Sequence, residues 1–414
     1  MEQTLAAVAA WISAALFLWA LLGSVCWGIR QLNAMPVPLH TERMDASDVR
    51  RIFIWLLITT LGIYAVGLVA QWMQYGAQSL PQAFVNAFHK SDALHYLEIA
   101  QNGYTSVGET RYFIVFFPLF PLLVRAFSLF TFGDLLLSAV LVNFALMFSA
   151  CLYVFKLGIL DFGKQTVHTA IQLMLVFPVA FFFHNAYSEP LFLLTSAASL
   201  YYTRTRRYMR AGLVGCLCAL TRAAGVLCAV PLVAQAFIDA WHDGRLHVGA
   251  WLRYAVWSLL APLGTGGYLL LNYVVTGNAF MFLIHQSEHW YNGFSLFPHA
   301  VSTVTEHMLT NQYAHHTALW ISQFVAIFLF LGLLVLGIRR LCTAMSLYNC
   351  AYFLMMISAA WLLSGPRYLM AMFPAFYVLS DLCATPVRRT TALCLSGLAL
   401  TVMTACFSMG HSIY

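Results

Sequence analysis

Apolar runs long enough to cross a lipid bilayer recur along the whole chain, separated by short polar stretches. Runs of this length are typical of transmembrane helices. The pattern predicts about twelve of them, at approximately residues 5–29, 52–74, 134–155, 167–184, 188–203, 211–225, 226–240, 254–275, 318–338, 341–363, 367–384 and 391–410. The two segments within 211–240 are short for spans, so a broken or tilted pair is expected there. The chain is therefore predicted to be an all-α polytopic membrane protein with a single membrane-embedded domain, residues 1–414.

Composition excludes a soluble interpretation of the 414 residues, because 61% are hydrophobic, only 9% are charged and the mean hydropathy is +0.77. In soluble domains about a quarter of the residues are charged. The first apolar run has no basic segment before it and is too long for the core of a signal peptide, so we expect a retained helix. The ten cysteines lie mostly in apolar runs without a Cys-x-x-Cys spacing, which is typical of small core residues.

Most basic residues lie in six clusters between the predicted helices: Arg30/Arg43/Arg50/Arg51, Lys156/Lys164, Arg204/Arg206/Arg207/Arg210, Arg245/Arg253, Arg339/Arg340 and Arg388/Arg389. An excess of lysine and arginine in short loops marks the cytoplasmic side of a membrane protein. The opposite, external side is then expected to hold both termini and two long loops, residues 75–133 and 276–317. This distribution accounts for the net charge of +6, so no nucleic-acid partner is expected.

A further apolar run at 113–131 is not counted as a span. Its Pro118, Pro121 and Arg125 suit an interfacial or re-entrant helix, and a span here would move the later basic clusters to the external side. Residues 75–133 are therefore predicted to be a long external loop with two juxtamembrane helices. Arg125 is expected to extend toward lipid head groups.

One of these two helices lies in residues 88–104, a polar stretch within an apolar sequence. Ser91 or Asp92 is expected to cap it and Gly103 to end it. His95, Tyr96 and Ile99 follow Asp92 by three, four and seven positions. In a helix this spacing places all four side chains on one face. Two interpretations stay open from these residues alone: a functional carboxylate and imidazole, or a helix cap and an ordinary interfacial histidine.

Five of the 21 lysines and arginines lie on or near the predicted external side: Lys90, Arg111, Arg125, Arg222 and Arg367. Arg222 and Arg367 are embedded in apolar sequence, where a cation is costly unless it is paired or faces a polar cavity. An anion at the membrane interface, such as a lipid phosphate, would satisfy both.

Glu189, at a predicted tight turn, either pairs with an arginine or caps the helix that follows. A carboxylate beside such a phosphate suits removal of a proton from an attacking hydroxyl, which suggests group transfer from a lipid phosphate.

Five segments in the same order resemble the PIG-V type glycosyltransferases, the GPI mannosyltransferase II family. They are Asp92-Ala-Leu-His95-Tyr96-Leu-Glu-Ile99-Ala100 with Gly103-Tyr104, then Phe116-Phe-Pro118-Leu-Phe-Pro121-Leu-Leu-Val-Arg125, Tyr187-Ser-Glu189-Pro-Leu-Phe192, Ala219-Leu-Thr-Arg222-Ala-Ala-Gly225, and Gly365-Pro-Arg367-Tyr-Leu369 with Phe373-Pro374. The resemblance spans roughly residues 85–380.

The resemblance implies a GT-C fold with its active site on the lumenal or periplasmic face. It further implies a polyprenyl-phosphate-mannose donor and inverting transfer of mannose to a hydroxyl of a lipid or glycan acceptor. Asp92 becomes the candidate general base, since inversion needs one carboxylate on the acceptor side. Arg222 and Arg367 become candidate partners of the donor phosphate. The remaining candidate residues for binding the substrate or orienting the loop are Lys90, His95, Tyr96 and Glu189.

The chain departs from the family pattern at Ser91, where an aromatic residue is frequent, and in its additional N-terminal helix. Because of these two differences, the resemblance does not identify the acceptor. The short loops favour a bacterial plasma-membrane protein over one of the endoplasmic reticulum. No cofactor is required by the sequence, and dependence on a divalent metal stays open.

Two alternative functions remain. His285-Gln-Ser-Glu288-His289 fits the H-x-x-E-H pattern of zinc peptidases, and further ligands are available in the same loop: His299, Glu306, His307, His315 and His316. A secondary transporter would also carry intramembrane arginines and broken helices, but it would be expected to contain an inverted repeat, which the sequence does not display.

Overall fold

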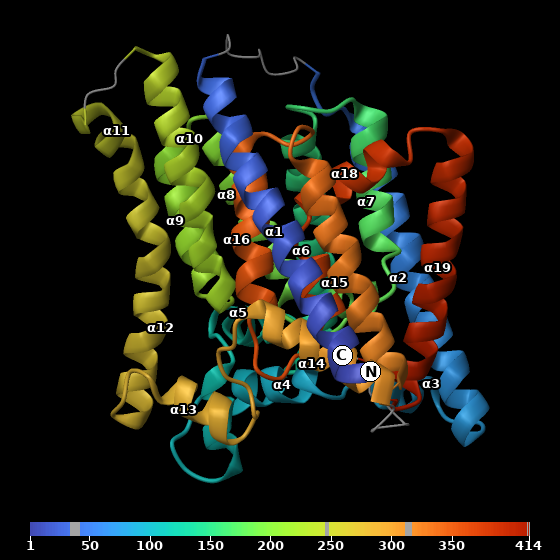
Figure 1. The fold of residues 1–414 in the computed structure, drawn as a ribbon. Coiled ribbons are helices and arrows are strands. Elements are labelled where there is room, and N and C mark those ends of the chain that lie inside the picture. Colours follow the sequence, from blue (N-terminus) through green and yellow to red (C-terminus); the bar gives the residue numbers. More distant parts are fainter. Residues whose placement is uncertain (34–41, 245–247, 311–316, 412, 414) are drawn as a thin grey trace.

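The computed structural model describes residues 1–33, 42–244, 248–310, 317–411 and 413. Within these ranges the chain forms helices α1 to α19 and four short 3-10 helices, and no β-strand (Figure 1). The predicted all-α class is confirmed. Arg245, His315 and His316 lie outside the described residues.

Seven helical segments among the described residues are long and apolar enough to cross a membrane. They are α1 (Glu2–Leu32), α2 (Ala46–Tyr75), α6 (Leu135–Gly158), η3 with α10 (Ala223–Cys228 and Ala229–His242), α11 with η4 and α12 (Val248–Ala255, Val256–Leu259 and Leu260–Thr276), α15 (Thr317–Gly337) and α19 (Pro386–Ser408). Each coincides with a predicted span.

The other five predicted spans correspond to shorter or interrupted helices. These are α7 (Lys164–Leu175) with η2 (Ala180–Phe183), α8 (Glu189–Arg204), α9 (Tyr208–Ala219), α16 (Thr343–Ile357), and α17 (Gly365–Met370) with α18 (Pro374–Leu382). Even α8, with 16 residues, extends only about 24 Å, less than the roughly 30 Å of a hydrocarbon core. A helix exists at every predicted position, but the number of twelve spans is not confirmed.

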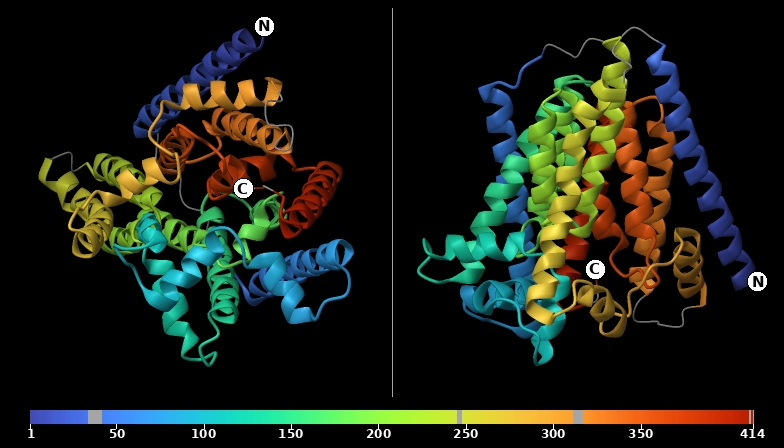
Figure 2. Two further views of the ribbon diagram at one scale, coloured as in Figure 1. Left: turned by 90° about the horizontal axis from the view of Figure 1, so that it is seen from below. Right: turned by 90° about the vertical axis from the view of Figure 1, so that its left-hand side faces the viewer.

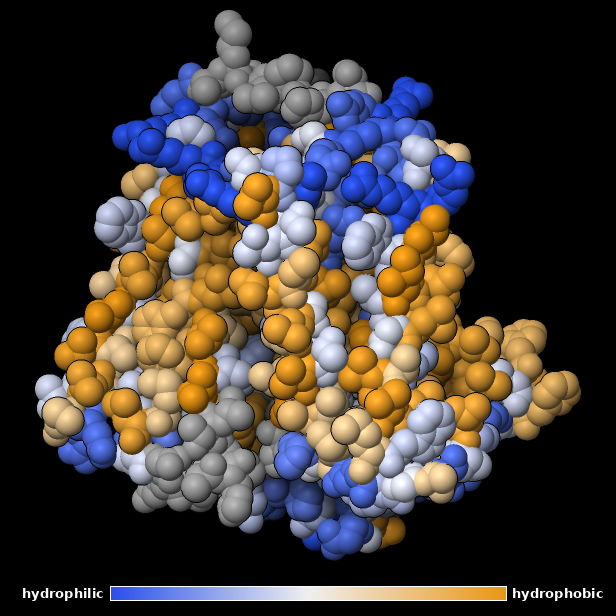
Figure 3. Space-filling model, turned by 90° about the vertical axis from the view of Figure 1, so that its right-hand side faces the viewer, coloured by the Kyte–Doolittle hydropathy of each residue, from blue (hydrophilic) through white to orange (hydrophobic). Residues whose placement is uncertain are grey.

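The two ends of the helical body differ in polarity. The end at the top of Figure 1, here called the basic end, holds the charged ends of α1, α6, α8 and α19 with Arg30, Lys156, Arg204 and Arg388. Hydrophilic side chains gather at this end above a broad apolar belt (Figure 3). At the opposite end α1 begins and α19 ends, beside the helices of the two long loops (Figures 1 and 2). This arrangement agrees with the predicted sidedness of the loops and termini.

The loop at 75–133 was predicted to hold two helices and holds three α-helices and one 3-10 helix. It contains α3 (Leu80–Phe88), α4 (Asp92–Asn102), η1 (Glu109–Val115) and α5 (Leu119–Ser128). The axes of η1 and α5 differ by 112°, so residues 113–131 do not form a straight span. α5 projects sideways from the helical body (Figure 2), and large apolar side chains on it and just after it are exposed: Leu122, Leu129, Phe130 and Phe132. Such a helix suits the membrane interface. The second loop contains α13 (Met281–Glu288) and α14 (Phe297–Thr310).

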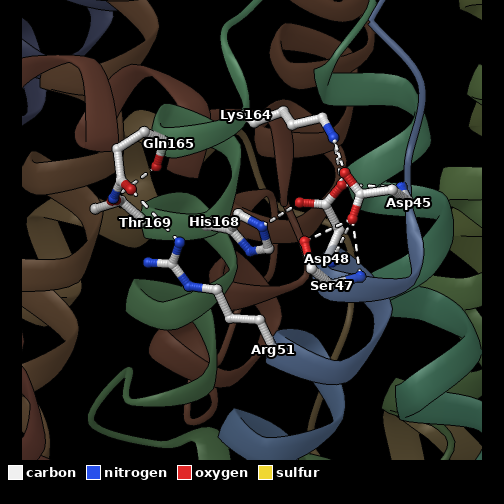
Figure 4. Close-up of polar contacts among 8 residues, drawn as sticks. All are labelled: Asp45, Ser47, Asp48, Arg51, Lys164, Gln165, His168 and Thr169. Carbon is white, nitrogen blue, oxygen red and sulfur yellow. Dashed lines mark hydrogen bonds and ion pairs between the residues drawn. The ribbon is translucent and has the colours of Figure 1, made fainter.

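A network of polar side chains ties α2 to α7 at the basic end (Figure 4). The Lys164 ammonium donates to Asp45 at 2.7 Å and to Asp48 at 2.6 Å. The second carboxylate oxygen of Asp48 lies 2.9 Å from Nε2 of His168, and both side chains are buried. Asp45 also caps α2 through the backbone N–H groups of Ser47 and Asp48. The network therefore fixes the start of α2 against the start of α7.

We predict that Asp48→Asn lowers the melting temperature of the purified protein by roughly 5 °C, because Lys164 then loses its buried carboxylate partner and His168 loses a charged hydrogen-bond acceptor. Asp45→Asn is the matched control: it contacts the same lysine from an exposed position and should have a smaller effect. Thermal unfolding in one detergent measures both variants. Equal effects of the two would show that burial of Asp48 adds nothing.

Candidate active site

The helix predicted in the polar stretch is present as α4, with Asp92 as its first residue. Gly103 ends it with a φ of 78°, as expected. Ser91 occupies the N-cap position but makes no side-chain capping bond, and its backbone has a φ of 52° and a ψ of −136°. Glycine adopts that conformation readily and serine only under strain. The peptide directly before Asp92 is therefore held in place by its surroundings.

Arg367 joins Asp92 to a second carboxylate in the interior. Its Nη1 donates to Oδ2 of Asp92 at 2.6 Å, and its Nε donates to Oε1 of Glu189 at 2.5 Å. Arg222 donates to the same Oε1 at 2.5 Å. Glu189 is fully buried, whereas 27% of the Asp92 side chain is exposed. The two carboxylates and two guanidinium groups thus form one neutral network, called here the Arg367 network, that extends from the interior to an accessible carboxylate.

Each member of the Arg367 network comes from a place where a helix begins or breaks. Asp92 and Glu189 are the first residues of α4 and α8, Arg222 lies between α9 and η3, and Arg367 lies in the first turn of α17. Non-helical backbone at membrane depth is tolerated only where protein buries it or where it lines a cavity. The short helices therefore stop at a common polar level, and that level is the site.

Gly225 allows Arg222 to reach this level. A Cβ at residue 225 would lie about 2.1 Å from the backbone carbon of Cys218, far inside van der Waals contact. Only glycine lets η3 fold back this closely on α9. The Arg222 guanidinium then lies 5.5 Å from the ring centre of Tyr368, next to Arg367 in sequence.

Aromatic rings and hydroxyls hold the network from behind. The Arg367 guanidinium lies 4.7 Å from the ring centres of both Phe182 and Tyr187. The Tyr187 hydroxyl donates to the backbone carbonyl of Lys90 at 3.2 Å, which fastens the start of α4 to the interior. The Tyr96 hydroxyl lies 2.8 Å from Oγ of Ser188, the residue before Glu189. Tyr96 is buried, so it positions the turn before Glu189.

Lys90 is turned toward the C-terminal end of α19. Its Nζ donates to the carbonyls of Ser408 at 2.7 Å and Phe407 at 3.1 Å, where a cation favourably meets the helix dipole. Burial lowers the pKa of the Lys90 amine to about 8. The side chain of Lys90 is thus bound to α19, and its backbone carbonyl is bound to Tyr187. These two contacts hold in place the residue that precedes the strained Ser91.

His95 lies one turn after Asp92, in a group of aromatic rings. Its ring centre is 4.3 Å from that of Phe113, 5.1 Å from that of Phe116 and 5.4 Å from that of Trp290. Burial lowers the pKa of His95, while the Asp92 carboxylate acts in the opposite direction. The imidazole is therefore neutral at pH 7.

The residues of the zinc pattern make aromatic contacts. His289 stacks on Tyr112 with ring centres 4.1 Å apart, and His285 meets the edge of the same ring at 4.9 Å. In the described part of the chain no three histidine, cysteine or acidic side chains are grouped so that they could hold a metal ion. Within that part, the geometry of a zinc peptidase is not present.

Comparison with family models and with curated proteins found no match. Among solved structures, the chain is similar to the oligosaccharyltransferase of Archaeoglobus fulgidus in its apo form, with 12% identity and a TM-score of 0.49, over 88% of this chain and 56% of that one. It is also similar to the same organism's oligosaccharyltransferase AglB in complex with an inhibitory peptide and a dolichol-phosphate, with 13% identity and a TM-score of 0.45, over 88% and 56% of the two chains. A complex with zinc and sulfate matches at 14% identity and a TM-score of 0.45, over 87% and 53%.

The chain thus spans about half the length of the structures it matches. Likeness at this level concerns the arrangement of helices in outline, and the chemistry of the site rests on its own residues.

Sequence reasoning found the four charged residues of the Arg367 network, and one of its two alternatives for Glu189, pairing with an arginine, is present, but it did not identify which residues pair. It also missed Phe182, Tyr187 and Ser188, which hold the network, and Trp290 beside His95. One signal was available: residues 184–189, His-Asn-Ala-Tyr-Ser-Glu, form a polar stretch between two apolar runs.

We predict that Glu189→Gln destabilises the protein strongly, by about 3 kcal/mol, because Arg222 then loses the carboxylate it is paired with and the buried Arg367 keeps only Asp92. Glu98→Gln is the control, because the only described side chain that bonds the Glu98 carboxylate is Asn102 of the same helix α4. Melting temperatures in the same detergent compare the two variants. A loss no larger for Glu189→Gln than for the control would contradict a compensating role of Glu189.

We also predict that Ser91→Gly raises stability by about 1 kcal/mol, because glycine relieves the strain of a positive φ. Ser79→Gly is the contrasting variant, since Ser79 caps α3 in an ordinary extended conformation and its replacement should not stabilise. The measurement is again thermal unfolding. A lowered melting temperature for Ser91→Gly would show that the peptide before Asp92 is unstrained.

Proposed function

We propose that this protein is a GT-C membrane glycosyltransferase that moves mannose from a polyprenyl-phosphate-mannose donor to an acceptor hydroxyl. The observation that carries the proposal is the Arg367 bridge, which joins the partly exposed Asp92 carboxylate to Glu189 and, through Glu189, to Arg222. The proposed base for the acceptor, Asp92, and the proposed cations for the donor phosphate, Arg222 and Arg367, therefore belong to one connected group. Both ligands of this reaction need those groups at one place.

In the proposed step, the acceptor oxygen attacks C1 of the mannosyl group from the face opposite the phosphate. The new C1–O bond forms as the C1–O bond to the phosphate breaks, and that electron pair leaves with polyprenyl phosphate. The acceptor proton passes to Asp92. Oδ2 of Asp92 is bound to Arg367, and Oδ1 makes no hydrogen bond to any described residue, so Oδ1 is the oxygen proposed to accept the proton.

The two arginines are proposed to stabilise charge on the leaving phosphate. Arg222 is the more exposed of the two, at 17% of its side chain against 6% for Arg367. Of the guanidinium nitrogens of Arg222, only Nη1 bonds to a described residue, so the other guanidinium N–H groups are free to donate to an anion. Glu189 balances the arginines when no phosphate is bound.

The proposed reaction takes place on the extracytoplasmic face. Its support is the distance along the helices between the Arg367 network and the basic end, together with the rule that basic loops stay cytoplasmic. The short loops favour a bacterial plasma membrane. Lys90 and Tyr96 are proposed to position the α4 start and the Glu189 turn rather than to bind the donor directly.

We predict that Asp92→Asn reduces mannose transfer at least about 100-fold, because asparagine keeps the shape of the side chain but cannot accept the proton. The measurement is transfer of radiolabel from synthetic polyprenyl-phosphate mannose to the lipids of the host membrane. Glu98→Gln on the same helix is the control and should transfer normally.

The melting temperature of Asp92→Asn distinguishes loss of chemistry from loss of fold. Transfer by a folded Asp92→Asn at the wild-type rate would exclude Asp92 as the base. Absence of transfer by the wild-type protein, with uptake of a solute into proteoliposomes instead, would favour the transporter.

A further inference from the structure

Helix α1 and the end of α15 enclose a groove of about 390 Å³ at the basic end of the helical body. α1 runs along the outside of the body beside α15 (Figures 1 and 2). Ile338, just after α15, packs so closely on α1 that a Cβ at Gly23 would lie 2.7 Å from its Cδ1. The walls of this groove, called here the Arg339 groove, carry Trp19, Cys26 and Arg30 from α1, and Leu336, Arg339 and Arg340 from the end of α15 and the turn after it.

Three arginines lie at the polar end of the Arg339 groove, and none of the described residues that line it is acidic. Arg30, Arg339 and Arg340 are all exposed, so a ligand can reach their guanidinium groups from outside the protein. Arg340 is paired with Asp381 at 2.9 Å. No side chain in the described part of the chain bonds the guanidinium group of Arg30 or of Arg339. Two accessible cations therefore remain for an anion at this groove.

The part of the groove away from the arginines is apolar. Trp19, Cys26 and Arg30 lie on one face of α1, because intervals of seven and four residues are close to whole helical turns. Eleven residues from Trp19 to Arg30 correspond to roughly 16 Å along the helix axis. The exposed fractions of Trp19 and Leu336 are 66% and 42%, so both walls are open to the surrounding lipid. The groove thus passes from guanidinium groups to apolar side chains over about half the thickness of a hydrocarbon core.

This arrangement matches a phospholipid with an anionic head group. Guanidinium groups bind phosphate through paired N–H donors, and basic pockets between transmembrane helices bind anionic head groups. Free phosphate or a nucleotide would use only the arginines and leave the apolar walls uncovered. A zwitterionic phospholipid carries its own cation, which would lie close to the arginines at a cost in Coulomb energy.

We propose that the Arg339 groove binds an anionic phospholipid of the leaflet at the basic end. Its phosphate lies between the guanidinium groups of Arg30 and Arg339, and an acyl chain follows Trp19 and Leu336. The lipid thereby covers Cys26 and connects α1 to α15. The groove lies at the opposite end of the body from the Arg367 network, so this site does not depend on the proposed function.

Cys26 is exposed in the groove and reports its occupancy in the unmodified chain. The delipidated full chain in detergent is alkylated with N-ethylmaleimide, and mass spectrometry of its peptides gives the rate at each cysteine. Phosphatidylglycerol should slow alkylation of Cys26 at least about fivefold, and phosphatidylcholine with the same acyl chains less than about twofold. Inorganic phosphate should leave the rate unchanged. Cys394, exposed on α19 outside the groove, is the internal control and should react equally in all conditions.

Two double variants separate the groove from general attraction between the basic end and anionic lipid. Arg30→Ala with Arg339→Ala should remove most of the protection of Cys26, because the phosphate loses both free cations. Arg210→Ala with Arg253→Ala removes two exposed arginines of other helices, and protection should persist. Melting temperatures show whether both variants are folded.

Three results would overturn the lipid site in the unmodified chain: equal slowing of Cys26 and Cys394, equal protection by the two phospholipids, or no protection by either. Protection by inorganic phosphate to the same degree would replace the lipid with a free anion. Full protection of Cys26 in the folded Arg30→Ala, Arg339→Ala variant would reject the two arginines as the head-group site.

Discussion

Arg367 is the buried cation on which the arrangement of this part of the molecule depends. It lies between Glu189 and Asp92, and Asp92 is 275 residues away from it in the chain. A guanidinium in an apolar body costs several kcal/mol unless it is paired and hydrogen-bonded. The pairing therefore brings α4, α8 and α17 to one place, and the most exposed member of the group is the Asp92 carboxylate.

The polar level around Arg367 exists because neighbouring helices stop there. Ends of helices leave carbonyls that need donors, and the surrounding side chains provide them. Tyr64 donates to the carbonyl of His184 at 2.6 Å, Asn143 donates to that of Tyr187 at 3.0 Å, and Tyr352 donates to that of Tyr368 at 3.0 Å. An apolar body thereby accommodates irregular backbone and charged groups without exposing them to lipid.

The two ends of the helical body use charge differently. At the basic end, cations pair with acids near the surface, as Arg206 does with Asp243 and Arg340 with Asp381. Such exposed pairs add little stability, and the excess of basic residues determines orientation instead. Around Arg367 the positive and negative charges are equal in number and largely buried. An incoming anion would therefore have to compete with Glu189 or Asp92 for the arginines. Binding of the donor phosphate would then affect the contact that positions Asp92, the proposed base.

Local sequence determined the helices, their approximate limits and the end at which the charged residues gather. Apolar length and basic loops decide these features before any long-range contact forms. It also predicted α4 and its end at Gly103, since a glycine with positive φ is a local signal. Sequence did predict the break between α9 and η3 within 211–240, but it did not reveal α3, the shortness of α7, α8, α16 and α17, or the direction of Lys90 toward α19. Nor did it reveal that Arg367 joins Asp92 to Glu189, or that His285 and His289 pack on Tyr112. Those features were decided by tertiary structure, because a buried charge or ring takes whichever partner the packing of distant helices brings within reach.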